Sequence, residues 1–213
     1  LRGRRQPAGS FQAELMKLCT FDTSGKTGYA GGDQAAARPE FSGTFKLPVN
    51  KPLTTRMVAL ETFAIDIIKK HGVQAIWVEQ PFVMNTKSED ALYTMMGLVF
   101  AVGMAAEKCG VFCKLVGSQE WRSDLGLPTV GPNDVMRLEH YRLKFGARKG
   151  GGLKEAKRQW VKDQAMEYAR RRMGVEPEDD NEGDAICMWR AFANERQAAV
   201  LAPTFDFGRD VTI

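Results

Sequence analysis

Residues 18–30, LCTFDTSGKTGYA, contain an apolar run that ends at a carboxylate, Asp22, and a polar turn that leads into a second run. The short apolar run predicts a buried strand over Leu18–Asp22, and the turn predicts a connection to a second strand over Thr27–Ala30. Phe41–Leu47 alternates well enough to predict a third, antiparallel strand. The N-terminal part therefore predicts the edge of a sheet, with an acidic side chain at the end of its first strand.

The next part of the chain alternates helices with strands. Apolar side chains recur at helical spacing from Pro52 to Lys70, and Gly72 ends this helix. A strand follows over Ala75–Glu79, then a long apolar helix over residues 88–108, then a strand over Val111–Val116. With a helical C-terminal part, this order predicts an α/β fold, in which a mixed five-stranded sheet is flanked by helices.

Three acidic residues border apolar segments. Asp22 and Glu79 end strands, and Asp184 opens the apolar stretch Ala185–Trp189. Carboxylates at the carboxyl ends of strands in an open sheet point into the crevice where ligands bind. Several carboxylates that converge there repel one another unless a cation lies between them, and hard oxygen ligands suit Mg²⁺ or Mn²⁺ better than zinc. The pattern predicts the layout of two-metal phosphoryl chemistry.

The bulk composition limits the alternatives. The 213 residues correspond to one domain of ordinary size, and the four cysteines form no CxxC pair. We therefore expect no structural zinc site and a reducing, cytoplasmic compartment. The longest uncharged run, residues 91–106, is too short to cross a bilayer comfortably, so we expect a buried helix and no membrane partner.

The net charge of +4 hides a strongly basic segment. Residues 137–172 hold twelve Lys and Arg against four Asp and Glu, and the glycines at 150–152 precede a basic helix. A charge run of this kind often forms only a solvated helix face. Beside a carboxylate cluster, however, a positive element suits a polyanion held over a metal site, which favours nucleic acid.

These motifs resemble those of RuvC-type Holliday junction resolvases, particularly their phage-like branch, within the ribonuclease H-like superfamily. Asp22 with the following Gly-Lys-Thr-Gly-Tyr-Ala, the pair Glu79-Gln80 and the pair Asp184-Ala185 stand in the family's order. The resemblance implies a ribonuclease H-like nuclease domain over residues 16–200. It leaves residues 1–15 as a disordered or vector-derived arm and residues 201–213 as a tail.

The resemblance also implies a catalytic set of Asp22, Glu79, Lys162 and Asp184. Two Mg²⁺ ions, replaceable by Mn²⁺, would be held by the three carboxylates. The family has a further carboxylate three residues before the last Asp, where this chain has Asn181. Asparagine offers a neutral oxygen ligand, and the adjacent Asp180 is the alternative source of the missing charge.

The resemblance further implies a metal-dependent endodeoxyribonuclease that resolves four-way DNA junctions in recombination, repair or phage DNA processing. Phe82 would stack on a junction base. A four-way junction has two-fold symmetry, which favours a homodimer. Helix 90–108 is either its contact surface or a fully buried core helix. The residues expected to contact DNA phosphates are Arg148, Lys149, Lys154, Lys157 and Arg158.

Three other functions remain open at the level of the sequence. A nuclease that debranches flaps, forks and three-way junctions would use the same motifs. A ribonuclease H that acts on RNA–DNA hybrids would use the same carboxylates. If Asn181 abolishes metal binding, the chain would be a catalytically inactive junction-binding protein.

Overall fold

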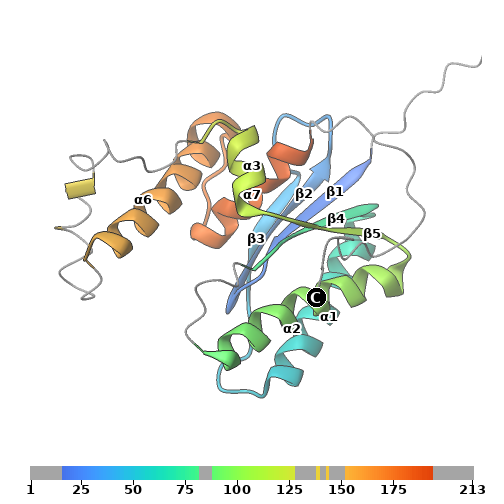
Figure 1. Cartoon of the computed structure of the whole chain (residues 1–213). Coiled ribbons are helices and arrows are strands. Elements are labelled where there is room, and N and C mark those ends of the chain that lie inside the picture. Colours follow the sequence, from blue (N-terminus) through green and yellow to red (C-terminus); the bar gives the residue numbers. More distant parts are fainter. Residues whose placement is uncertain (1–15, 82–87, 128–137, 140–142, 144–151, 194–213) are drawn as a thin grey trace, which may run out of the picture.

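The computed structural model of the chain describes residues 16–81, 88–127, 138–139, 143 and 152–193. Its centre is a five-stranded sheet with the strand order β3-β2-β1-β4-β5 (Figure 1). The central strand β1 is antiparallel to β2 and parallel to β4, which is in turn parallel to β5. The strands are β1 (Lys17–Asp22), β2 (Lys26–Asp33), β3 (Phe41–Lys46), β4 (Ala75–Glu79) and β5 (Phe112–Val116).

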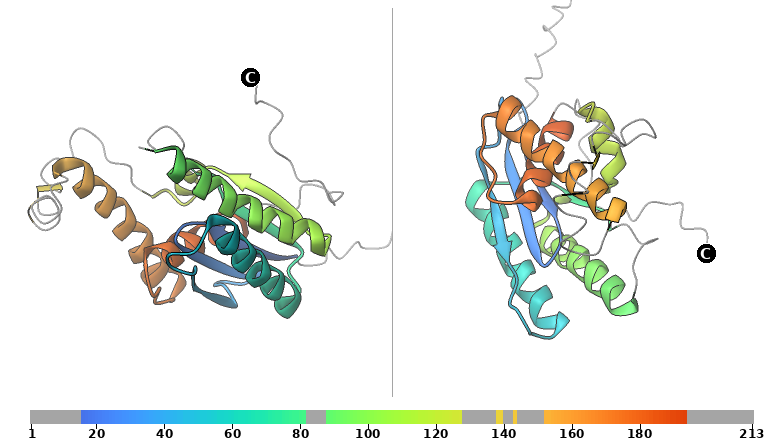
Figure 2. Two further views of the ribbon diagram at one scale, coloured as in Figure 1. Left: turned by 90° about the horizontal axis from the view of Figure 1, so that it is seen from below. Right: turned by 90° about the vertical axis from the view of Figure 1, so that its left-hand side faces the viewer.

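Helices cover both faces of this sheet. One face carries α1 (Leu53–His71) and α2 (Glu89–Cys109), and the other carries α3 (Ser118–Asp124), α6 (Gly152–Tyr168) and α7 (Asp180–Ala193) (Figures 1 and 2). A short π-helical turn, η4 (Ala169–Met173), extends α6. Because β1 and β4 are covered on both faces, their side chains divide between two apolar cores instead of alternating between core and solvent.

The helix α2 is long and apolar enough to cross a membrane by length and composition alone. In this fold it packs along α1, and Leu98, Val102 and Ala105 are buried in the core between these helices and the sheet. Ser88 caps its first turn by accepting a hydrogen bond from the Ala91 backbone N–H, and Gly110 ends it in the left-handed conformation. We therefore interpret α2 as a core helix with one exposed side.

The mixed five-stranded sheet flanked by helices confirms the fold class expected from the sequence. Observed boundaries lie close to the expected ones, except that β2 continues three residues beyond Ala30, to Asp33. The last helix begins at Asp180, so Asp184, which was expected just inside an apolar helix, lies in its second turn. Residues 180–183 are polar, so hydrophobic periodicity does not predict that they belong to the helix. Tertiary contacts hold them there.

Candidate active site

Two of the acidic residues lie side by side at one edge of the sheet. Asp22 ends β1 and Glu79 ends β4, and the parallel register pairs Phe21 with Val78 directly before them. Parallel strands carry their carboxyl ends to the same edge, so the strand pairing alone brings these two carboxyl groups together. A hydrogen-bonding interaction between the Asp22 and Glu79 side chains raises the pKa of Asp22 and lowers that of Glu79.

The third acidic residue comes from α7, which lies against β1 and β2. The hydroxyl of Thr20, a fully buried residue of β1, donates a hydrogen bond of 2.8 Å to the backbone carbonyl of Ala185. Thr20 lies two residues before Asp22 on the same face of the strand, and Ala185 directly follows Asp184. This buried bond therefore fixes the position of Asp184 relative to the end of β1.

Gly28 allows α7 to approach the sheet closely. Gly28 pairs with Asp22 across the β1–β2 ladder, and a Cβ at this position would lie 2.0 Å from the backbone oxygen of Asn181. No side chain fits in that space, so the first turn of α7 rests directly on the backbone of β2. The glycine is thus required by the helix that carries Asp184.

We expect Gly28→Ala to displace the start of α7, since the clash is with backbone atoms that no rotamer change relieves. The free energy of unfolding should fall by about 1–3 kcal/mol, the usual cost of forcing an extra carbon into a packed site. Gly25→Ala in the same hairpin is the matched control, because a Cβ there would meet nothing within 4 Å. Equal stability of both alanine variants in chemical denaturation would contradict the proposed role of Gly28.

Side-chain hydrogen bonds also hold the start of α7 against the hairpin of β2 and β3. Buried Glu182 accepts hydrogen bonds of 2.7 Å from the Ser42 hydroxyl and from the backbone N–H of Glu178. One oxygen of Asp179 accepts from the Thr44 hydroxyl at 3.0 Å and from two backbone N–H groups of the first turn of α7. The hairpin therefore positions the helix that supplies the third carboxylate.

Burial and neighbouring charges shift the pKa values of the three carboxyl groups. Burial raises the pKa of Asp22 well above its usual value, and the nearby charges of Glu79 and Asp184 raise it further. Burial also raises the pKa of Glu79, and it raises the pKa of Asp184 to about 7 although the Arg122 guanidinium opposes it. Glu79 raises the pKa of Asp184 as well as that of Asp22, so added positive charge would favour the ionised forms of these two carboxyl groups.

Two basic side chains supply part of that charge. Lys162 of α6 forms an ion pair with Asp180, and its charge lowers the pKa values of Asp22 and Asp184. Arg122 of α3 donates a hydrogen bond of 2.9 Å to Asp184 in a largely buried ion pair. Lys162 was expected from the family resemblance and the structure brings it to the carboxylates, but Arg122 was not expected.

Arg122 is held in place by three elements. Besides its bond to Asp184 in α7, it donates a hydrogen bond of 3.3 Å to the carbonyl of Val161 in α6. Its guanidinium also stacks over the ring of Trp121, 4.2 Å from the centroid. The buried indole N–H of Trp121 faces Glu79 and lowers its pKa, although it does not reach full hydrogen-bond geometry. The sequence signal was limited to a Trp-Arg pair after the last strand, which is too general to indicate a site.

The carboxylates are suited to a divalent cation by their chemistry. Only oxygen ligands face the site from Asp22, Glu79 and Asp184, and such ligands suit Mg²⁺ or Mn²⁺. As they stand, no three His, Cys, Asp or Glu side chains in the described part of the chain converge to hold a metal ion. The Asp22 side chain interacts with Glu79, and Asp184 is paired with Arg122. A cation would replace these two contacts.

Asp180 and Asn181 both lie in the first turn of α7, four and three residues before Asp184. Residues at either spacing share a helix face, so each can reach the site that Asp184 faces. The Asp180 carboxylate is paired with Lys162, and the backbone of Asn181 rests on Gly28. The expectation that one of them supplies the additional ligand remains a prediction.

The residues expected to bind DNA are only partly described. Lys157 and Arg158 are exposed on α6, the helix that also carries Lys162. Lys154 belongs to the same helix, but its side chain is outside the described part of the structure. Phe82, Arg148 and Lys149 lie outside the described residues, as do the two terminal segments 1–15 and 201–213.

The fold is similar to that of solved resolvase structures. Thermus thermophilus RuvC in complex with a Holliday junction substrate superposes with a TM-score of 0.58 at 16% sequence identity, over 84% of this chain and 92% of RuvC. A second Thermus thermophilus RuvC structure gives 0.54 at 18% identity, over 83% and 94% of the two chains. Neither a protein-family model nor a curated protein matches the sequence. The similarity confirms the expected RuvC-like, ribonuclease H-like fold.

Proposed function

We propose that this protein is a metal-dependent, structure-selective DNA endonuclease that resolves four-way junctions by paired nicks. The observation that carries the proposal is that Asp22, Glu79 and Asp184, from β1, β4 and α7, lie near enough for their charges to interact, with two basic side chains beside them. The shared fold with RuvC, solved in complex with a Holliday junction, supports four-way DNA as the substrate.

In the proposed reaction Asp22, Glu79 and Asp184 would hold two Mg²⁺ ions, with Asn181 or Asp180 as a further ligand. Such ions would supply acidification of an attacking water and charge stabilisation at the leaving 3′ oxygen, so that the products would carry a 5′-phosphate and a 3′-hydroxyl. Lys162 and Arg122 offset the negative charge that builds on the phosphate, because their charged groups already lie against the carboxylates. Lys157 and Arg158 bind neighbouring phosphates without reading sequence.

A gel cleavage assay with Mg²⁺ or Mn²⁺ tests this function. It compares a four-way junction, a fork, plain duplex and an RNA–DNA hybrid, with Asp22→Asn as the blank. Symmetric paired nicks on the junction alone would support a resolvase, and equal cutting of forks would instead favour a debranching nuclease. Preferential cutting of the hybrid would favour ribonuclease H. Tight junction binding without any cutting would identify an inactive binding protein.

The ligand next to Asp184 can be identified by exchanging Asn181. We expect Asn181→Asp to lower the Mg²⁺ concentration for half-maximal thermal stabilisation severalfold, because it restores an anionic oxygen three residues before Asp184. Asp180→Asn is the paired variant. If Asp180 is the ligand, this variant weakens Mg²⁺ binding and Asn181→Asp changes little. If the parent protein does not cut and Asn181→Asp restores cutting, then this chain is a catalytically disabled form of the proposed nuclease.

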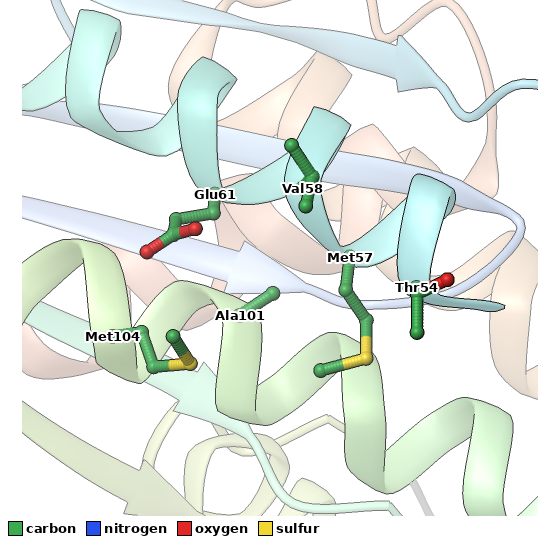
Figure 3. Close-up of a pocket in the computed structure, with 6 residues that line it drawn as sticks. All are labelled: Thr54, Met57, Val58, Glu61, Ala101 and Met104. Atoms are coloured by element: carbon green, nitrogen blue, oxygen red, sulfur yellow. The ribbon is translucent and has the colours of Figure 1, made fainter.

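Because the substrate has two-fold symmetry, we also propose that the protein acts as a homodimer through α1 and α2. A shallow apolar hollow of about 150 Å³ lies between these helices (Figure 3). Val58 beside it is 59% exposed and Met104 is 48% exposed. A second copy of this surface would bury both side chains. The residues that line the hollow are Thr54, Met57, Val58, Glu61, Ala101 and Met104.

The double substitution Val58→Glu and Met104→Glu should convert the dimer into a monomer, because it would bury four like charges at a two-fold contact. Sedimentation at micromolar concentration measures the change, and Lys70→Glu at the far end of α1 is the control. We expect the monomeric variant to bind a junction but to lose paired nicking. A monomeric parent protein would exclude the proposed dimer.

A further inference from the structure

A second hollow, of about 370 Å³, opens next to the turn that follows β1. It is formed where the β1–β2 turn meets the connection from β3 to α1, and it is lined by Gly25, residues 47–51 and Arg56. The backbone N–H of Leu47 donates a hydrogen bond to the carbonyl of Gly25, which ties the two segments together. The hollow is therefore held by the sheet and not by one loop alone.

The strand registers place this hollow at the edge of the sheet that carries Asp22. Gly28 of β2 pairs with Asp22, and Lys26 of β2 pairs with Lys46 of β3, so the hairpin continues past Asp22. Since neighbouring strands are about 4.8 Å apart, β3 lies about 10 Å across the sheet from β1. That distance corresponds to about three base-pair steps of DNA. A duplex arm bound at Asp22 can therefore reach the hollow.

The charges around the hollow favour an anion. Lys51 is exposed and Arg56 is half-buried, and within the described residues neither side chain forms an ion pair. The first turn of α1 carries no acidic residue. The neighbouring lysines, in contrast, have carboxylate partners. Lys26 lies 3.8 Å from the Asp179 carboxylate, and Lys46 lies 3.5 Å from the Glu178 carboxylate. Two cations that have no carboxylate partner among the described residues and line one polar hollow suit a phosphate group, and none of the described lining residues is a carboxylate that could hold a metal ion.

We propose that this hollow is a second DNA-binding site, in which Lys51 and Arg56 bind backbone phosphates of a junction arm. The site deepens the proposed function and depends on it. DNA would then be held by Lys51 and Arg56 at this edge of the sheet as well as by Lys157 and Arg158 of α6. Such contacts set affinity and register without reading sequence.

The test measures binding of a fluorescent four-way junction to the full chain without divalent metal, between about 50 and 200 mM salt. Lys51→Gln with Arg56→Gln should reduce the slope of log K against log [salt] by about 1.8, since each phosphate contact contributes about 0.9. The matched control is Lys69→Gln with Lys70→Gln, which removes the same charge from the exposed far end of α1. Each single substitution at Lys51 or Arg56 should give about half the change, and thermal unfolding verifies that all variants are folded.

The outcomes separate the two proposals. A reduced slope for the Lys51 and Arg56 variant alone supports the second site. Equal slopes for this variant, its control and the parent overturn it, while junction cleavage by the parent leaves the proposed function intact. A parent protein that binds no junction overturns both. A slope reduced equally by both variants would indicate only a general loss of net charge and would also overturn the second site.

Discussion

Asp22→Asn is expected to abolish the proposed junction cleavage, by about 1000-fold or more, and at the same time to stabilise the metal-free protein. The pKa of Asp22 is raised in the folded chain, so the folded state binds more protons than the unfolded state near neutral pH. The free energy of unfolding therefore decreases as pH rises above the unfolded value, and ionisable Asp22 costs stability at pH 7. Asparagine removes this cost and can still donate a hydrogen bond to Glu79.

Thermal unfolding with and without Mg²⁺ measures both effects. Without metal, the melting temperature of the variant should be higher than that of the parent by a few degrees, roughly 2–4 °C for each kcal/mol. With Mg²⁺ the parent should gain stability and the variant should gain much less. Asp66→Asn, which changes an exposed carboxylate of α1, is the control and should alter neither quantity. A variant that cuts the junction at the parental rate would exclude Asp22 from the proposed chemistry.

Arg122→Ala is expected to have the largest effect on stability. Its partner Asp184 is largely buried, and removal of one member of a buried pair costs about 3 kcal/mol because the other is left uncompensated. Asp184→Asn in the same chain should recover most of that loss, since the remaining side chain is neutral. Chemical denaturation of the two single variants and the double variant gives the coupling energy directly.

Activity separates a structural role of Arg122 from a role at the scissile phosphate. If Arg122 offsets charge on the phosphate, Arg122→Lys should retain part of the activity while Arg122→Ala loses it by about 100-fold or more. These differences should appear in the maximal cleavage rate with saturating Mg²⁺, where both proteins are folded. If the Arg122→Ala variant and the parent have the same midpoint of denaturant unfolding, then the ion pair contributes little to stability and this account of Arg122 is wrong.

Local sequence was sufficient for most of the fold. The apolar runs that end at Asp22 and Glu79 predicted β1 and β4, because a strand buried on both faces has few polar residues until it reaches the sheet edge. Ser88 and Gly110 predicted the ends of α2 through their capping chemistry. The order of strands and helices predicted the mixed sheet. From the same signals the sequence also predicted that the carboxylates of Asp22 and Glu79 lie at the carboxyl ends of strands, with Asp184 as a third member of the site.

The tertiary structure alone decided what surrounds those carboxylates. Arg122 and Asp184 are 62 residues apart in the chain, and Thr20 and Ala185 are 165 apart. Neither pair produces a periodic or capping signal, because each depends on how closely a helix packs onto the sheet. The sequence determined the acidic ends of the strands through local burial, whereas the packing of α3, α6 and α7 determined which charges meet them. Long-range packing has no local pattern, and for that physical reason Arg122 and the hollow at Lys51 became apparent only in the folded chain.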